Sequence, residues 1–168
     1  MNGRTKVSRR KGRILAFQAL YSWDVSKASL EDLLTFSWLQ KDSEIISANQ
    51  KSEEEALESE TSENIKNSEA SKEAKLFASL VISGTIEHIL EIDEKIKTYL
   101  SASWSMERIN KVSLAVLRSS IYELVYQKDS EPKIVIDEAI NIAKRYGSDD
   151  SYKFINAVLD KIAKNELS

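Results

Sequence analysis

Basic side chains gather at the N-terminal end of the chain. Residues 1–23 contain no acidic residue and six basic ones: Arg4, Lys6, Arg9, Arg10, Lys11 and Arg13. This stretch carries a formal charge of +6, and the whole chain carries −3, so the rest of the chain carries −9. A local positive end on an acidic body suits a polyanion: nucleic acid, an acidic protein face or an anionic lipid surface. A solubilising tail is the alternative, but the segregation of charge favours a binding role.

The same residues are expected to lie at the start of a buried helix. Between residues 9 and 25 there is no proline, and the apolar residues spread over more than one helical face. Such a helix must be covered on several sides, so we place it between two helical layers with its basic end projecting. The spacing lets Arg9, Arg10 and Arg13 share one face. Cations at a helix N-terminus oppose the helix dipole, so helix stability does not explain them.

Residues for catalysis are scarce. The chain has no cysteine and one histidine, which excludes thiol catalysis, disulfides and polyhistidine metal centres. The four glycines are too dispersed for a phosphate-binding loop, and no G-x-S-x-G motif occurs. His88 and Glu91 can share a helix face, but two ligands do not make a metal site. We therefore expect no enzyme activity, no cofactor and no metal.

Composition predicts an all-α protein. One proline and four glycines are too few for an all-β sandwich or barrel. Apolar periodicity predicts helices over residues 9–25, 29–40 and 72–90, from about 93, over 113–125 and 133–146, and after 150, with a short turn after 105. No apolar run reaches 18 residues, so we expect a soluble protein without a membrane span. Gln18 interrupts the apolar run that follows the basic residues, and no small-residue cleavage site comes after it, so we expect a cytoplasmic protein without a signal peptide.

Residues 47–75 stand apart from these helices. They contain eight Glu, six Ser and four Lys and no aromatic residue, so they cannot bury enough surface to order themselves. We read them as a mobile or loosely helical insertion. An acidic decoy that competes with nucleic acid for the basic end is the less favoured alternative.

Single residues add local predictions. Ser29 is expected to cap its helix, and Pro132 suits a first helical turn. Gly84 lies inside a helix, where close approach of another helix would explain it, and Gly147 suits a left-handed position past a helix end. We also expect Arg118 and Glu138, both among apolar residues, to pair between helices.

Several segments together resemble the NusB family of bacterial transcription antitermination proteins. The opening residues 8–24 carry the resemblance, as do Ile92-Asp93, Trp104 and Glu107-Arg108-Ile109. The strongest stretches are 116–118, 122–124, Pro132 followed by 135–139, 143–144, 146–147, 150–151 and 153–160. Their order and spacing are specific, although each piece alone is weak.

The resemblance implies a fold and a function. The fold is a compact all-α bundle of about seven helices in two subdomains, with the arginine-rich first helix at their junction. We set the subdomains at 1–103, including a linker at 42–71, and 104–168. The implied function is non-catalytic binding of boxA, a single-stranded RNA element on nascent ribosomal RNA transcripts, jointly with the ribosomal protein NusE. That complex helps RNA polymerase read through terminators.

The resemblance also implies site residues. The positions matching RNA contacts are Arg9, Arg10, Lys11, Arg13, Tyr21, Lys153 and Phe154. The expected NusE face surrounds Glu107 and Ser113, although Ser113 replaces the family's usual acid. Two further departures are Asp137 for a usual asparagine and Ala157 for a usual glycine. The rival function is a helical protein–protein adaptor without RNA binding of its own.

Overall fold

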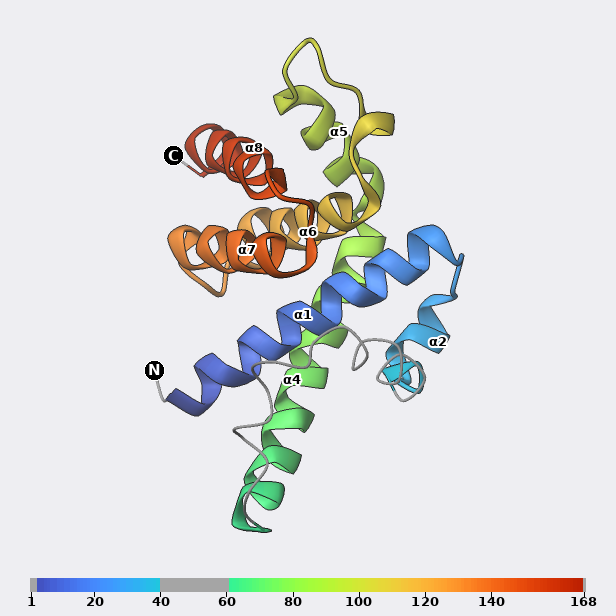
Figure 1. Ribbon diagram of the computed structural model, residues 1–168, viewed down its shortest axis with the longest axis vertical. Coiled ribbons are helices and arrows are strands. Elements are labelled where there is room, and N and C mark those ends of the chain that lie inside the picture. Colours follow the sequence, from blue (N-terminus) through green and yellow to red (C-terminus); the bar gives the residue numbers. More distant parts are fainter. Residues whose placement is uncertain (1–2, 40–60, 168) are drawn as a thin grey trace.

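The computed structural model describes residues 3–39 and 61–167, and these form helices without a strand (Figure 1). The α-helices are α1 (Gly3–Val25), α2 (Leu30–Leu34), α4 (Thr61–Glu87), α5 (Ile89–Tyr99), α6 (Lys111–Ile121), α7 (Pro132–Tyr146) and α8 (Ser151–Glu166). A 3₁₀ turn, η1 (Met106–Arg108), precedes α6, and a π-helical segment, η2 (Tyr122–Gln127), follows it. The predicted all-α bundle is confirmed.

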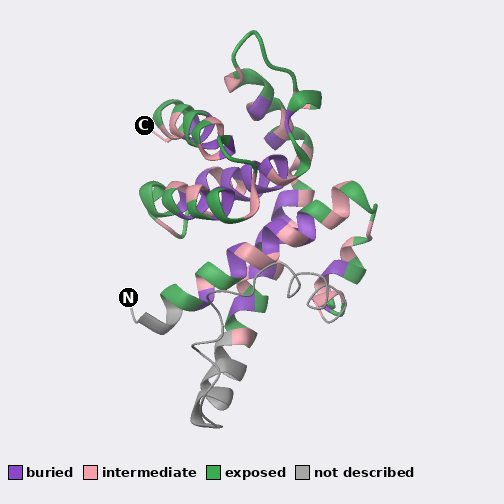
Figure 2. Cartoon of the chain, viewed as in Figure 1, coloured by how far each residue is buried: buried purple, intermediate pink, exposed green. Residues whose placement is uncertain are grey.

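Helix α1 lies between two hydrophobic clusters. Its Phe17 and Leu20 join the larger cluster, which is built mainly from α6, α7 and α8. Its Ala16 and Ala19 join the smaller one, with α2 and α4. Figure 1 shows α1 running between α4 and the α6–α7 pair, and Figure 2 shows burial concentrated in its middle. The expectation that this helix is covered on several sides is therefore confirmed.

The larger cluster forms around α6. Every residue of α6 from Ser113 to Ile121 is buried, because α1, α5, α7 and α8 all pack against this helix. Helix α5 belongs to the same cluster through Ile92 and Ile96. The predicted boundary at 103/104 falls after α5, and the division of the chain into two subdomains stays a prediction.

Several helices begin or end at residues other than those that the apolar periodicity predicts. Helix α2 ends at Leu34 rather than residue 40, since Phe36 turns to a positive φ of 55°. Its predicted cap is confirmed, because Ser29 accepts a hydrogen bond from the Asp32 N–H. Helix α4 begins at Thr61, so residues 61–71 of the predicted linker are helical, and residues 40–60 lie outside the described residues. Helix α5 begins at Ile89 rather than near residue 93.

The predictions for the proline and for two of the glycines have different outcomes. Pro132 opens α7 as predicted. A Cβ at Gly84 would overlap the Tyr122 ring, so the predicted close approach is confirmed. The left-handed prediction for Gly147 is wrong, because this residue is extended, with φ −91° and ψ 179°. Space explains this glycine instead: a Cβ would collide with the Ser151 hydroxyl and the Ala143 carbonyl.

Candidate nucleic-acid interface

Arg13 is buried rather than presented to solvent. Its Nε and NH2 groups donate to the Glu123 carboxylate at 3.0–3.1 Å, and NH2 also donates to Ser130 Oγ at 3.1 Å. The side chains of Arg13 and Glu123 are only 8% and 4% exposed. The expectation that Arg13 projects beside Arg9 and Arg10 is therefore wrong. Arg13 lies one turn deeper in α1, where the helix has already met the C-terminal half of the chain.

The π-helical segment supplies the carboxylate that Arg13 needs. In η2 the Lys128 N–H donates to the Glu123 carbonyl at 2.9 Å, the five-residue spacing of a π-helix. The wider turn places Glu123 in the interior beside α1. Burial raises the pKa of the Glu123 carboxyl, and the Arg13 guanidinium opposes that rise. A buried pair of this kind is costly to break, because removing one member leaves a buried charge.

Arg10 is held at the surface by a second carboxylate. Its Nε donates to both Glu138 oxygens at 3.2 Å, and its NH2 donates to Oε1 at 3.0 Å. The Arg10 side chain remains 55% exposed, whereas that of Glu138 is 9% exposed. These hydrogen bonds, and then the charge of Glu138, raise the pKa of Arg10. One edge of the guanidinium is thereby fixed while the rest faces solvent.

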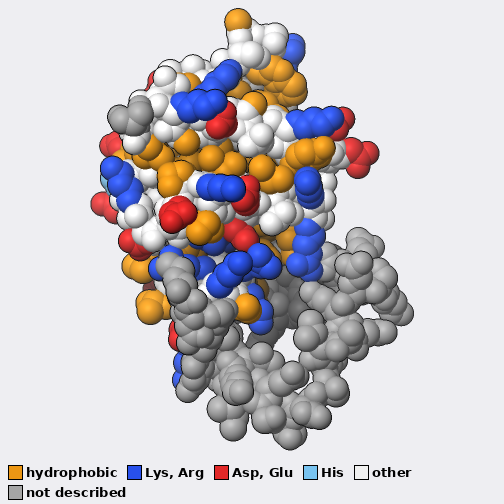
Figure 3. Space-filling view, turned by 90° about the vertical axis from the view of Figure 1, so that its left-hand side faces the viewer, with side chains coloured by type: hydrophobic (Ala, Val, Ile, Leu, Met, Phe, Trp, Pro, Cys, Tyr) orange, Lys and Arg blue, Asp and Glu red, His pale blue; other side chains and the backbone are white. Residues whose placement is uncertain are grey.

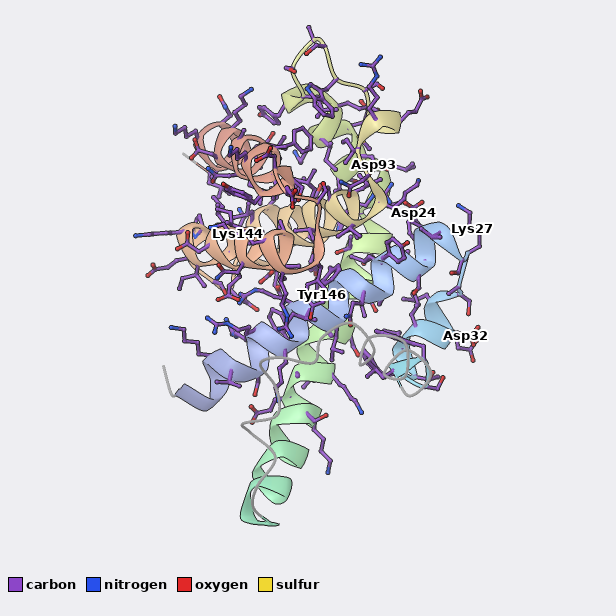
Figure 4. All side chains as sticks on the ribbon, viewed as in Figure 1. Asp24, Lys27, Asp32, Asp93, Lys144 and Tyr146 are labelled. Atoms are coloured by element: carbon purple, nitrogen blue, oxygen red, sulfur yellow. The ribbon has the colours of Figure 1, made fainter. Side chains whose placement is uncertain are left out.

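The predicted Arg118–Glu138 pair is wrong, although both charges are buried as expected. Arg118 donates to both Asp93 oxygens at 2.9 Å, and its NH1 lies 3.5 Å from Asp24. Figure 4 shows Asp24 and Asp93 approaching from α1 and α5 near the start of α6. Arg118 therefore faces α5 and the end of α1, which leaves Glu138 to Arg10.

Three other cations whose side chains the structure describes lie in the N-terminal turns of α1. Arg9 donates from NH1 to Ser130 Oγ at 2.9 Å and lies over the Phe77 ring, 5.6 Å from its centroid. Lys6 and Lys11 are exposed, and neither forms an ion pair with a described residue. Figure 3 shows several Lys and Arg side chains close together on this face of the molecule. We call Lys6, Arg9, Arg10 and Lys11 the basic tip.

The aromatic positions are accessible to different degrees. Tyr21 on α1 is 37% exposed. Phe154 is half-buried, and Trp104 stacks on it with ring centroids 5.3 Å apart. Sequence reasoning gave Trp104 no role, although its indole is 47% exposed. Lys153 is exposed beside Phe154, and a hydrogen bond to Asp150 raises its pKa.

The two residues expected to contact NusE differ in accessibility. Glu107 lies in η1 and is exposed. Ser113 is 2% exposed in the first turn of α6, where its N–H donates to the Asn110 side chain at 2.8 Å. A partner cannot touch the Ser113 hydroxyl while α6 stays in place, so Ser113 is not retained as a direct contact.

The lone histidine belongs to a surface cluster of side chains. His88 Nδ1 lies 3.2 Å from Glu91 Oε2, and its ring stacks on Tyr126 at 4.0 Å. The Tyr126 hydroxyl donates to Glu91 at 2.6 Å. Within residues 3–39 and 61–167, no group of three His, Cys, Asp or Glu side chains is arranged to hold a metal ion. None of the helices described there has the length and apolar character needed to cross a membrane.

Comparison with known proteins gives one consistent result. The family model described as NusB family matches residues 10–164. A transcription antitermination protein NusB from Treponema denticola is 49% identical over 156 residues, which cover 93% of this chain and 96% of that protein. One from Borreliella burgdorferi is 39% identical and covers 91% and 92%.

Solved structures agree with the sequence matches. T. maritima NusB superposes with a TM-score of 0.70 at 34% identity, covering 95% of this chain and 93% of that one. A crystal structure of antitermination factors NusB and NusE in complex with dsRNA gives a TM-score of 0.68 at 25% identity, covering 94% and 96%.

Proposed function

The chain belongs to the NusB family of transcription antitermination proteins, and from this premise we propose that it binds boxA-type single-stranded RNA on nascent ribosomal RNA transcripts. It does so together with NusE, in the cytoplasm, and the complex helps RNA polymerase read through terminators. Its part is that of a binding factor, in keeping with a family that acts without catalysis.

The observation that carries this proposal is the basic tip of α1. Its four cations lie in the first turns of the helix, and carboxylates in the C-terminal half hold the helix there through Arg10 and Arg13. Phosphates supply the negative charge that a cationic helix N-terminus lacks. A tip fixed to the body presents its charges without first having to be ordered, which favours binding.

Aromatic side chains supply the second element of single-strand binding. Tyr21 exposes part of its ring, and Trp104 and Phe154 form a stacked pair beside Lys153. Stacking of an unpaired base on such rings is sequence-tolerant and contributes about 1–3 kcal/mol per base. These contacts do not distinguish RNA from DNA, and family membership favours RNA.

The NusE partnership rests on a structural relative and one exposed acid. A neighbour with a TM-score of 0.68 contains NusB and NusE in complex with dsRNA. Glu107 is the accessible residue of the proposed partner face. The alternative, an adaptor that binds protein only, predicts the same face but no use for the basic tip.

A binding titration separates the two functions. A labelled boxA-like RNA is titrated with the protein, with and without NusE, at several salt concentrations. Each phosphate contact contributes about 0.7 to the log–log salt slope of a single strand. Lys6→Ala with Lys11→Ala should therefore reduce the slope by roughly 1.4. The control is Lys97→Ala with Lys161→Ala, two exposed lysines on α5 and α8.

Two results bear on the proposal. Weaker binding and a flatter slope for the tip variant, with the control unchanged, support it. No RNA binding by the unaltered protein at low salt, with or without NusE, would leave the adaptor function.

A further inference from the structure

A surface pocket lies where the basic tip meets α7. It has a volume of about 190 Å³ and opens between the two helices. Pockets for drug-sized ligands span roughly 300–1,000 Å³, so this one suits a single planar group. Tyr146 belongs to its lining, and Figure 4 shows this residue between the end of α7 and α1.

The lining combines an apolar floor with polar groups at the rim. Ile14 from α1 and Ile142 from α7 supply the floor, and Tyr146 packs beside them against Phe17 at 5.1 Å. Asn141 is exposed at the rim, one α7 residue before Ile142. An apolar floor with a few convergent polar groups is the usual character of a ligand site.

The charged residues around the pocket favour an anionic group beside it. Arg10 and Arg145 both line it, and the carboxylate that also lines it, Glu138, is already bound by Arg10. The Arg10 Nε and NH2 groups carry the bonds to Glu138, and NH1 has no hydrogen-bond partner among the described residues. The guanidinium is held through its other two nitrogens, so NH1 remains available to donate to a ligand beside the pocket.

We propose that this pocket receives one unpaired base of the bound RNA, with Asn141 reading the edge of the base and Arg10 binding the adjoining phosphate. The proposal rests on the proposed RNA-binding function and extends it to a specific residue. A base is planar and apolar on its faces, which fits the floor, and polar along its edge, which fits the amide. An asparagine amide offers one donor and one acceptor group, the combination that pairs with base edges.

Arg10 thereby links the two parts of the interface. It belongs to the basic tip, whose other members make sequence-independent phosphate contacts, and it also lines the pocket. Glu138 acts as a positioning residue, since it fixes the orientation of the guanidinium. Sequence preference then originates at Asn141, and affinity originates at the tip.

The test is a double-mutant cycle between protein and RNA. Binding of single-stranded boxA-like RNA, with NusE present, is measured by fluorescence anisotropy for the unaltered protein and for Asn141→Ala. A matching set of RNAs carries one abasic position each. Alanine suits an exposed helix position, so the variant keeps its fold. Asn165→Ala is the control, because Asn165 is also an exposed asparagine, at the far end of α8.

One abasic position should weaken binding of the unaltered protein by roughly 5-fold or more, because a stacked base is lost. Asn141→Ala should weaken binding of the intact RNA by roughly 3- to 10-fold, because one hydrogen-bonded contact is lost. On that one abasic RNA, Asn141→Ala should bind as tightly as the unaltered protein. Asn165→Ala should behave as the unaltered protein on every RNA.

Two results overturn the base pocket while leaving RNA binding intact. In the first, Asn141→Ala binds the intact RNA as tightly as the unaltered protein. In the second, the loss of affinity caused by Asn141→Ala is equally large on the intact RNA and on every abasic RNA. Failure of the function itself differs from both, since the unaltered protein would then show no preference for boxA-like RNA over a scrambled strand, and the pocket assignment would be overturned with it.

Discussion

Replacing Arg13 tests whether this residue is an RNA contact or a structural one. The family resemblance places it with the RNA-binding residues, whereas the structure buries its guanidinium against Glu123. Arg13→Met removes the charge and keeps an apolar side chain of similar length. The Glu123 carboxylate then stays buried without its partner, which costs about 3–5 kcal/mol of unfolding free energy.

That cost sets the size of the expected signal. For a domain of 150–250 residues, each kcal/mol shifts Tm by roughly 2–4 °C, so Arg13→Met should lower Tm by about 6–20 °C. Adding Glu123→Met removes the orphaned charge and should restore most of the stability, because apolar replacement of a buried pair is often neutral. Thermal and urea unfolding followed by circular dichroism measure both variants.

Arg10→Met is the matched comparison. The Arg10 side chain is 55% exposed but that of Glu138 is only 9% exposed, so losing the pair should cost about 1–3 kcal/mol, less than the loss at Arg13. RNA affinity should fall clearly for Arg10→Met. For the double variant at Arg13 and Glu123, affinity should stay within a few-fold at a temperature where it is folded. The reasoning is refuted if Arg13→Met melts like the unaltered protein yet no longer binds RNA.

Three further changes have defined outcomes. Gly84→Ala should lower the unfolding free energy by about 1–3 kcal/mol in urea titrations, because its Cβ overlaps Tyr122, and an unchanged midpoint would contradict that contact. Trp104→Ala should weaken RNA binding by roughly 5-fold or more through lost stacking, and affinity unaffected by this change would show that the indole does not stack on a base. Burial, and then the bond to Glu91, raises the pKa of Tyr126 to about 12, above the ordinary 10.0. The folded state therefore holds the Tyr126 proton more tightly than the unfolded state, so the stability that this raised pKa contributes is complete below pH 10 and is lost as the pH rises toward 12. In an ultraviolet titration, the ionisation of a tyrosine near pH 12 should be present in the unaltered protein and missing in Tyr126→Phe.

Local features of the sequence predicted local features of the fold. The Ser29 cap, the Pro132 helix start and the crowding at Gly84 each depend on residue chemistry that leaves few alternatives. The prediction for Gly147 was wrong and the one for Gly84 was right, although lack of space explains both glycines. Both positions exclude a side chain because of a neighbour, and the sequence offers no means of telling lack of space from left-handed backbone.

Apolar periodicity could not predict which residues pair with the buried charges. The apolar surroundings of Arg118 and Glu138 indicated two buried charges, and both are buried. Periodicity fixes which face of a helix turns inward, but not which helix lies opposite, so the two residues were paired with each other. Their true partners, Asp93 and Arg10, come from α5 and α1, and only the packing of α6 against α5 and of α7 against α1 decides this.

The three arginines of α1 show how burial divides one residue type into different functions. By spacing alone, Arg9, Arg10 and Arg13 are equivalent. In the fold each contacts a different environment: the hydroxyl of Ser130 and a phenyl ring, a carboxylate at the surface, and a carboxylate in the interior. Arg13 ties α1 to η2 and Arg10 ties it to α7, so two attachments one turn apart prevent the helix from pivoting. The exposed cations beside them, Lys6 and Lys11, can then meet phosphates from a fixed helix. The entropy of ordering this part of the chain is lost on folding rather than on binding.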